Sequence, residues 1–324
     1  MNLEQSVPDS RTSSPTFWPG VLVGAVVGNL SVFLGAQLLG AYTNALFIGA
    51  PIVVGFLPPV INGCRERLTF RQALTHSVCA AMLSGIGLII WGLEGIICIA
   101  IAFPLFVPGS LIGGLLGNSM MLLLRDLRSR QTTAIVAILV TPFITVFESE
   151  QIDYHHEKDI RSHTTSIIID ASPEEVWPHV IAFPDIDPPH EFLFRAGIAY
   201  PIRARIEGSG PGAVRYCEFS TGDFVEPITV WDEPYRLAFD VTEVAPTMTE
   251  LSPWNIEPHH LHGYFVSTKG EFRLERLPDN RTRLSGTTWY YQRMSPRAYW
   301  DIWGDYIVGT IHTRVLEHIR RNVE

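Results

Sequence analysis

Three histidines, His259, His260 and His262, lie within four residues in the stretch "EPHHLHGYF". Imidazole nitrogens bind divalent metals and act as general bases near neutral pH. If a strand begins at residue 262, His260 and His262 share one face and form a metal pair together with Glu257. Zinc sites normally add a distant, well-defined ligand set, so we predict no metal here. We expect His260 and His262 to lie at the mouth of a ligand cavity, with solvated or structurally hydrogen-bonded histidines as the alternative.

Glu226 is the candidate catalytic residue. In "FVEPITV" it alternates in phase with apolar residues, so a regular strand turns its carboxyl group toward the apolar side. Burial raises the pKa of a carboxyl group, which suits a general acid or base acting on an enol or carbonyl substrate. Two alternatives stay open: Pro227 marks a bulge or edge that re-aims the side chain, or Arg215 or Arg205 pairs with it. Glu218 is a weaker candidate of the same kind.

Aromatic side chains form a third group of candidates. Trp289 and Tyr291 share one face of the last predicted strand, and Trp300, Trp303 and Tyr306 lie on the predicted terminal helix. We expect the helix to cover that face, so these rings either pack together or line an apolar ligand cavity. The predicted ligand-binding residues are Glu218, Phe224, Ile228, His260, His262, Trp289, Tyr291, Trp300, Trp303 and Tyr306.

Charge and missing motifs exclude several classes of function. The chain has 324 residues and a net charge of −9, and residues 148–324 carry 17 Lys+Arg against 28 Asp+Glu, a balance of −11. Binding to nucleic-acid phosphates needs clustered positive charge, so we expect no nucleic-acid partner. The sequence contains no serine-centred elbow, phosphate loop or paired-cysteine motif, and we predict no cofactor.

Residues 20–147 are apolar enough to form a membrane domain after an N-terminal tail of residues 1–19. Residues 1–147 contain seven Arg, no Lys and five acidic residues. A helix needs about 20 apolar residues to cross the hydrocarbon layer. We therefore predict about five spans. They are Gly20–Ala41, Ala45–Ile61, Ala73–Gly92, one within Gly95–Leu124, and Thr132–Phe147.

Arginine-rich loops set the predicted orientation. The loops "CRERLTFR" and "RDLRSR" each carry three arginines, and short loops of this kind stay cytoplasmic. With five spans both loops face the cytoplasm, and the C-terminal half is extracytoplasmic. Pro104 and Pro108 interrupt the fourth span, which predicts a kinked helix or a short interfacial piece, with six spans as the alternative.

Small residues predict close helix packing in the first span. Gly20, Gly24 and Gly28 lie one above another on a helix face and let a neighbouring backbone approach closely. The neighbour is either another helix of the same chain or a second copy, which would make a homo-oligomer through this face.

The pattern changes to that of a mixed α/β domain after a linker at residues 148–163. "TTSIIIDAS" predicts a strand, and Ser172 with Glu175 forms the capping box of a short helix. A long excursion at residues 244–263 interrupts the strands that follow, and a helix of about 28 residues capped by Ser295 ends the chain. The strands predicted from period-two alternation are 201–207, 212–220, 224–232, 235–243, 264–277 and 282–291.

This order of elements resembles the START-like or SRPBCC superfamily, the helix-grip fold of polyketide cyclase/dehydrase and lipid-transfer domains. The similarity lies in "IIIDASPEEVWPHVIAFPDI", "GDFVEPITVWDEPYRLAFDV", "GEFRLERLPDNRTRLSGTTWYY" and the terminal helix, over about residues 164–323. It implies a curved antiparallel sheet closed over the C-terminal helix, with a hydrophobic small molecule bound between them. The predicted fold class is an N-terminal α-helical transmembrane bundle followed by this α+β domain, residues 164–324.

Three functions are compatible with these expectations. The first is a multi-pass membrane protein whose tethered domain binds a hydrophobic or lipid-like molecule beside the bilayer, where that molecule is concentrated. The second is a cyclase or dehydratase on a polyketide-like or isoprenoid substrate, with Glu226 as acid or base. The third is a sensor whose cavity controls a partner through the spans.

Overall fold

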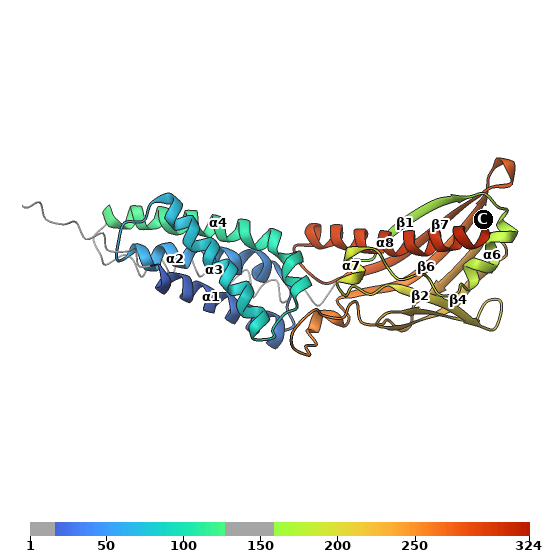
Figure 1. Cartoon of the computed structure of the whole chain (residues 1–324), viewed down its shortest axis with the longest axis horizontal. Helices are drawn as coiled ribbons and strands as arrows, with labels where there is room; N and C mark the ends of the chain where they lie inside the picture. Colours follow the sequence, from blue (N-terminus) through green and yellow to red (C-terminus); the bar gives the residue numbers. More distant parts are fainter. Residues whose placement is uncertain (1–16, 127–158) are drawn as a thin grey trace, which may run out of the picture. The chain divides into compact units, whose positions relative to one another are not determined.

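The computed structural model describes residues 17–126 and 159–324 (Figure 1). Their contacts divide the chain into two compact units. Unit 1 holds most of the apolar helices. Unit 2 holds the C-terminal domain together with residues 31–47 and 88–103, which flank the ends of the helices.

The apolar half forms four long helices in the described residues. The first consists of α1 (Trp18–Val32) and the π-helical η1 (Phe33–Leu38), and the second of η2 (Ala45–Gly49) and α2 (Ala50–Gly63). The others are α3 (Phe70–Ile90) and α4 (Ile96–Asp126). All four are long and apolar enough to cross a membrane, in agreement with four of the five predicted spans. The fifth, Thr132–Phe147, lies outside the described residues.

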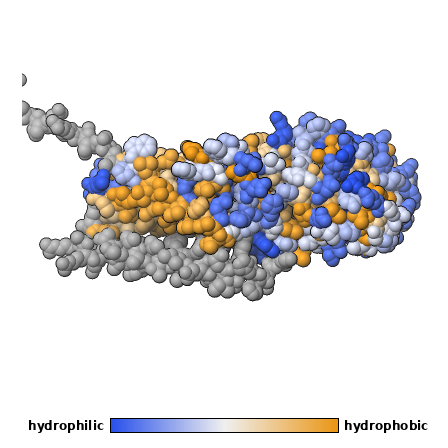
Figure 2. Space-filling view, turned by 90° about the horizontal axis from the view of Figure 1, so that it is seen from below, coloured by the Kyte–Doolittle hydropathy of each residue, from blue (hydrophilic) through white to orange (hydrophobic). Residues whose placement is uncertain are grey.

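The outer surface of these helices is apolar. Leu22, Val26 and Leu30 lie four residues apart on α1, and each leaves about half or more of its surface exposed. Figure 2 shows hydrophobic residues over the helices and mostly hydrophilic residues over the C-terminal domain. Exposed apolar surface of this kind is typical of a membrane or protein interface. The prolines predicted to kink the fourth span lie inside one helix, α4, and no separate interfacial piece precedes it in the described residues.

The glycine face of α1 packs against helices of the same chain. A Cβ at Gly20 would lie 2.7 Å from the Pro58 carbonyl oxygen, and one at Gly24 would lie 2.9 Å from the Val54 carbonyl oxygen. Gly28 abuts α3, and all three glycines are buried. The absence of side chains is therefore what brings α1 close to α2 and α3. This is the packing within one chain that the sequence offered as one alternative, and a homo-oligomer through this face stays a prediction.

The C-terminal domain contains one seven-stranded antiparallel sheet, which confirms the predicted fold class (Figure 1). The strand order is β1-β7-β6-β5-β4-β3-β2, so strands β2 to β7 are consecutive neighbours and β1 pairs with β7 at the edge. The strands are β1 (Arg161–Ile169), β2 (Pro201–Glu207), β3 (Val214–Phe219), β4 (Gly222–Asp232), β5 (Arg236–Asp240), β6 (Phe265–Arg276) and β7 (Thr282–Gln292).

Three helices accompany the sheet: α6 (Pro173–Ile181), α7 (Phe192–Arg195) and α8 (Arg297–Val323). The predicted capping box of α6 is present, with the Ser172 backbone N–H and hydroxyl both donating to Glu175 Oε2 at 2.8 and 2.7 Å. The last helix begins one residue after Pro296 and packs along β1 and β7 (Figure 1).

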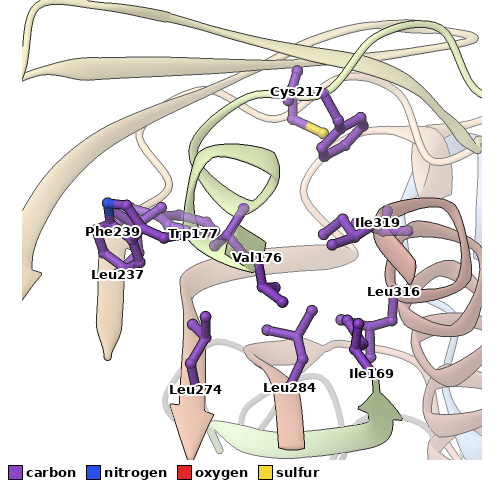
Figure 3. Close-up of a cluster of buried hydrophobic side chains, with 14 of the residues drawn as sticks. Ile169, Val176, Trp177, Cys217, Leu237, Phe239, Leu274, Leu284, Leu316 and Ile319 are labelled. Carbon is purple, nitrogen blue, oxygen red and sulfur yellow. The ribbon is translucent and has the colours of Figure 1, made fainter. Parts of the chain in front are cut away.

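The C-terminal part of α8 anchors the hydrophobic core of the domain. Leu316 and Ile319 are fully buried and belong to one cluster with Ile169 of β1 and Leu284 of β7 (Figure 3). Full burial of each such side chain contributes about 1.5–3 kcal/mol relative to exposure. The earlier turns of α8 meet the sheet through polar groups instead, because His312 contacts the Thr288 hydroxyl at 2.7 Å. The sheet therefore packs against an apolar part and a polar part of the same helix.

Candidate functional site

Glu226, the predicted catalytic residue, is buried and paired with Arg215. The two residues are direct cross-strand partners on β4 and β3, and their side chains form an ion pair. Arg215 is 2 % exposed, and its Nε donates to the Ile181 carbonyl at 3.1 Å. The register irregularity of β4 falls between Ile228 and Val230, so Pro227 does not re-aim the carboxyl group. The prediction of an inward carboxyl holds, and so does the alternative that an arginine pairs with it.

The surroundings of this pair are those of a hydrophobic core. The guanidinium carbon of Arg215 lies 5.4–5.6 Å from the ring centroids of Phe183, Phe239 and Phe272. Burial raises the pKa of Glu226, and the guanidinium acts in the opposite direction. Opposite charges that are paired and buried in this way neutralise each other. The carboxyl group of Glu226 is therefore engaged by Arg215 inside the core.

The other predicted residues of the central strands separate onto two faces. Ile228 is buried in the core, and Phe224 packs beside it against Phe219, with ring centroids 4.4 Å apart. Glu218 lies on the opposite face of β3 from Arg215, because side chains alternate along a strand. There Glu218 accepts a hydrogen bond from Arg203 Nε at 2.7 Å. The prediction that Glu218 lines the cavity is therefore wrong.

The predicted face of β7 is also wrong by one residue. Tyr290, not its neighbours, faces α8: its hydroxyl donates to Asp305 Oδ1 at 2.6 Å. Since alternate residues point to opposite faces, Trp289 and Tyr291 lie on the face away from α8. Aromatic residues occupy both faces of "TTWYYQ", so alternation alone does not select the inner one.

The aromatic residues of α8 do not gather around one cavity. Trp300 is buried against Phe47, with ring centroids 4.9 Å apart. Trp303 is half-buried beside Tyr306, and Tyr306 itself is 57 % exposed. Tyr306 therefore does not line a closed cavity, whereas a ligand role for Trp303 stays a prediction.

The three histidines of the stretch "EPHHLHGYF" have different environments. His259 and His262 are exposed, and His260 is buried in the 3-10 turn η3 (His259–Leu261). His262 is therefore not part of a buried site together with His260. The side chain of His260 lies among four polar side chains, those of Tyr42, Glu94, Cys98 and Glu250. We call these four residues and His260 the His260 cluster.

Three separate stretches of unit 2 build this cluster. Tyr42 lies between the first two apolar helices, Glu94 lies just before α4 and Cys98 in its first turn, and Glu250 and His260 belong to the long excursion between β5 and β6. A backbone hydrogen bond of 3.0 Å from the Ile96 N–H to the Leu251 carbonyl joins the last two stretches. The cluster is thereby held by backbone as well as by side chains.

The hydrogen bonds of the cluster set the orientation of His260. The Tyr42 hydroxyl donates to Glu94 Oε1 at 3.0 Å, so its oxygen can accept the proton of His260 Nδ1, also at 3.0 Å. His260 Nε2 then points at Glu250 Oε1 at 3.0 Å and Cys98 Sγ at 3.1 Å. In a neutral imidazole protonated on Nδ1, Nε2 carries a lone pair and faces another acceptor.

Negative charge in the cluster exceeds the positive charge available. In the described residues, the ion pairs of Glu94 and Glu250 are both with His260. The Oε2 atoms of both glutamates are buried without a hydrogen-bond partner, each at a cost of about 1–3 kcal/mol. Burial raises the pKa of Glu94 to about 7, although His260 lowers it. The pKa of His260 is raised as well: burial opposes this, but Glu250 and Glu94 favour the charged form.

Of the five residues in the His260 cluster, only His260 was predicted from the sequence to belong to a site. The sequence does contain one sign of these partners. Glu94 is an acidic residue in the turn "WGLEG" between two apolar segments, where a charged side chain is costly. Nothing in the spacing connects it with Glu250, which lies 156 residues further along the chain. Glu94, Cys98, Glu250 and His260 each offer one ligand atom, and these four atoms lie within 4.8 Å of one another.

Solved structures of low identity cover the C-terminal half of the chain. An aromatase/cyclase from Streptomyces sp. R1128 is 16 % identical, covers 51 % of this chain and 93 % of its own, and has a TM-score of 0.36. Truncated norcoclaurine synthase from Thalictrum flavum is 10 % identical, covers 52 % and 95 %, and has a TM-score of 0.34. A protein from Nitrosospira multiformis is 18 % identical, covers 51 % and 97 %, and has a TM-score of 0.32.

Among curated proteins, none matches this chain. A family model does match, from the first residue of β1 to just beyond the end of β7. The family is described as polyketide cyclase / dehydrase and lipid transport, and its match with this chain covers residues 161–294.

Proposed function

We propose that this protein is a membrane-anchored helix-grip domain that binds a hydrophobic or lipid-like small molecule between its sheet and α8, close to the bilayer. The observation that carries the proposal is the composition of unit 2. It combines the domain with residues 31–47 and 88–103, which include one end of each of the four apolar helices. The binding surface is thereby tied to the ends of segments that are apolar enough to span a membrane.

Contacts inside unit 2 support this arrangement. The Ser295 N–H, just before α8, donates to the Tyr42 carbonyl at 2.9 Å. Tyr42 also belongs to an apolar cluster that includes Leu88 and is packed by Tyr264 and Met294. The residues before α8 and at the start of β6 therefore share a hydrophobic core with the helix ends.

The inner face of the sheet supports an apolar ligand. Around the fully buried core lie apolar side chains that keep part of their surface exposed, among them Ile206, Phe219, Phe224 and Phe272. They come from four different strands. Apolar walls with few polar groups are typical of small-molecule sites, and the description of the matching family includes lipid transport.

The pairing of Glu226 with Arg215 favours ligand binding over acid-base catalysis. The alternative of a cyclase or dehydratase needs Glu226 to exchange a proton with a substrate. Arg215 occupies that carboxylate instead, within the core. We therefore rank ligand binding above the enzymatic alternative.

The loops also support an extracytoplasmic domain. Residues 39–44 and 91–95 join apolar helices at one end of the bundle, and the arginine-rich loop at residues 64–69 joins α2 to α3 at the other. If the arginines are cytoplasmic, the loops that belong to unit 2 are outside. The chain then has to cross the membrane once more after α4, and Thr132–Phe147 is the segment with the composition to do so.

The proposal is tested by extracting the full chain under mild conditions and identifying co-purified hydrophobic molecules by mass spectrometry. Ile206→Trp adds bulk on the inner face of β2 and is expected to reduce ligand recovery at least tenfold. Glu207→Trp, on the adjacent outer position of the same strand, is the matched control and should leave recovery unchanged. Equal recovery from both variants, or no enriched molecule in the parent protein, would contradict binding between the sheet and α8.

A further inference from the structure

We propose that Glu94, Cys98, Glu250 and His260 form a binding site for a divalent transition metal of the zinc type. This site is separate from the ligand-binding surface between the sheet and α8. It lies where the start of α4 meets the excursion between β5 and β6, within unit 2.

The donor atoms suit such an ion. One imidazole nitrogen, one thiol sulfur and two carboxylates are all common zinc ligands, with bond lengths of about 2.0–2.3 Å. Ligand atoms arranged tetrahedrally at those distances lie about 3–4 Å apart. Here Cys98 Sγ is 2.9 Å from Glu250 Oε1 and 3.1 Å from His260 Nε2, and all four donors fall within 4.8 Å. Small adjustments would therefore complete the coordination sphere.

Two buried oxygens are a second, independent indication that a cation fits here. Within residues 17–126 and 159–324, the Oε2 atoms of Glu94 and Glu250 are buried and have no hydrogen-bond partner. Their side chains are only 8 % and 1 % exposed, so solvent does not compensate. A bound dication would offset the negative charge of these two buried carboxylates.

Tyr42 supplies the outer support that metal-binding histidines usually have. A ligating imidazole commonly donates its other N–H to an oxygen that fixes the ring and its tautomer. His260 Nδ1 lies 3.0 Å from the Tyr42 hydroxyl, which in turn donates to Glu94. These two hydrogen bonds leave the lone pair of His260 Nε2 directed at Cys98 and Glu250, where the ion would lie.

Gly95 provides the space for one of the ligands. A Cβ at this position would collide with the carboxylate of Glu250, so any larger residue would push that ligand away. The presence of a sulfur ligand also narrows the choice of ion. Thiolates favour zinc, cobalt and related transition metals over magnesium or calcium.

The test uses the full chain, purified in detergent without a histidine tag, and titrated with Zn²⁺ or Co²⁺. We expect one ion per chain by elemental analysis, and cobalt absorption that includes a thiolate-to-metal charge-transfer band. Cys98→Ser should abolish that band, whereas Cys64→Ser, which alters an exposed cysteine, should retain it. Magnesium in excess should not compete with cobalt.

Matched substitutions assign the remaining ligands. His260→Ala and Glu250→Gln should each lower cobalt affinity at least tenfold, and His262→Ala, in the exposed part of the same turn, should not. Tyr42→Phe keeps the ring but removes the support, and should weaken binding about 10–100-fold. It also keeps the test decisive where a ligand substitution disturbs folding. No stoichiometric ion in the parent protein, or equal affinity in His260→Ala and His262→Ala, would overturn the proposal.

Discussion

Two buried groups of charged side chains in this protein differ in their balance. Glu226 has one partner, Arg215, and the two charges cancel inside an aromatic core. The His260 cluster contains two carboxylates that share one histidine as ionic partner, and two of its oxygens have no hydrogen bond within the described part of the chain. The first group is complete without anything else, and the second is not.

This difference separates structure from function more reliably than burial does. Both groups are equally hidden from solvent, and both contain carboxyl groups with raised pKa values. Glu226 attracts attention in the sequence, because it interrupts an apolar strand. In the structure its charge is compensated by Arg215 on the neighbouring strand, whereas Glu94 and Glu250 share His260 as their ionic partner among the described residues.

The largest expected effect comes from breaking the complete pair. Glu226→Gln leaves Arg215 buried without a counter-charge, which should destabilise the full chain by about 3–5 kcal/mol. Thermal or denaturant unfolding, followed by the near-ultraviolet signal of the C-terminal domain, measures the loss.

The double variant Arg215→Met with Glu226→Leu is the control. It removes both charges at once, so most of the lost stability should return. If the single and double variants were equally unstable, the pair would not be the balanced unit described above. Wild-type stability in Glu226→Gln combined with lost turnover on a substrate would instead favour the enzymatic alternative.

A second effect contrasts His260 with another buried histidine. His312 contacts hydroxyl groups of Thr288 and Thr165 rather than carboxylates. Burial, and to a smaller degree the charge of His163, lowers the pKa of His312 to about 4. Because the folded state binds this proton less readily than the unfolded chain, stability is intact above about pH 6.5 and falls as the pH decreases toward 4. The loss at the acid end is roughly 3 kcal/mol.

The measurement is the pH dependence of unfolding for the parent protein and for His312→Asn. The variant should lose the part of the acid sensitivity that falls between pH 6.5 and 4. Identical profiles for the two proteins would show that His312 is solvated rather than enclosed by α8 and the sheet.

Removing the ion should have a slightly smaller effect. With free Zn²⁺ at about 100 times its dissociation constant, binding stabilises the folded state by about 2.7 kcal/mol. A chelator should remove this increment from the parent protein but not from Glu250→Gln. An equal response of both proteins would place the ion elsewhere in the chain.

The smallest effect has the opposite sign to the first. In chelator-treated protein, Glu94→Gln removes a buried charge that lacks an adequate partner, and its amide oxygen can still accept from Tyr42. We expect a gain of about 1 kcal/mol, where Glu226→Gln loses several. A comparable loss in both variants, measured by the same unfolding assay, would remove the distinction between the two groups.

The sequence predicted the elements of this protein better than their faces. Apolar length identified four helices, the Ser172–Glu175 capping box located α6, and alternation identified the strands of the sheet. Alternation also turned Glu226 inward correctly. It failed on β7, where both faces carry aromatic rings and only contact with α8 shows that Tyr290 is the inner one.

The His260 cluster could not be predicted from the sequence for a different reason. Periodicity describes neighbours along one element, but Tyr42, Glu94 and Glu250 come from three separate stretches of the chain. The excursion that carries Glu250 and His260 has no repeating pattern from which to read an orientation. His260 was chosen for its residue type, and its partners are defined only by the packing of unit 2.

The length of α4 determines how a movement at the His260 cluster would affect this helix. Cys98 lies in the first turn of a helix of 31 residues, which at 1.5 Å per residue is about 46 Å long. A movement of Cys98 toward or away from Glu250 would tilt the first turns of this helix or bend it at Pro104 and Pro108. For a helix of this length, a tilt of about 5° corresponds to a displacement of about 4 Å between its two ends.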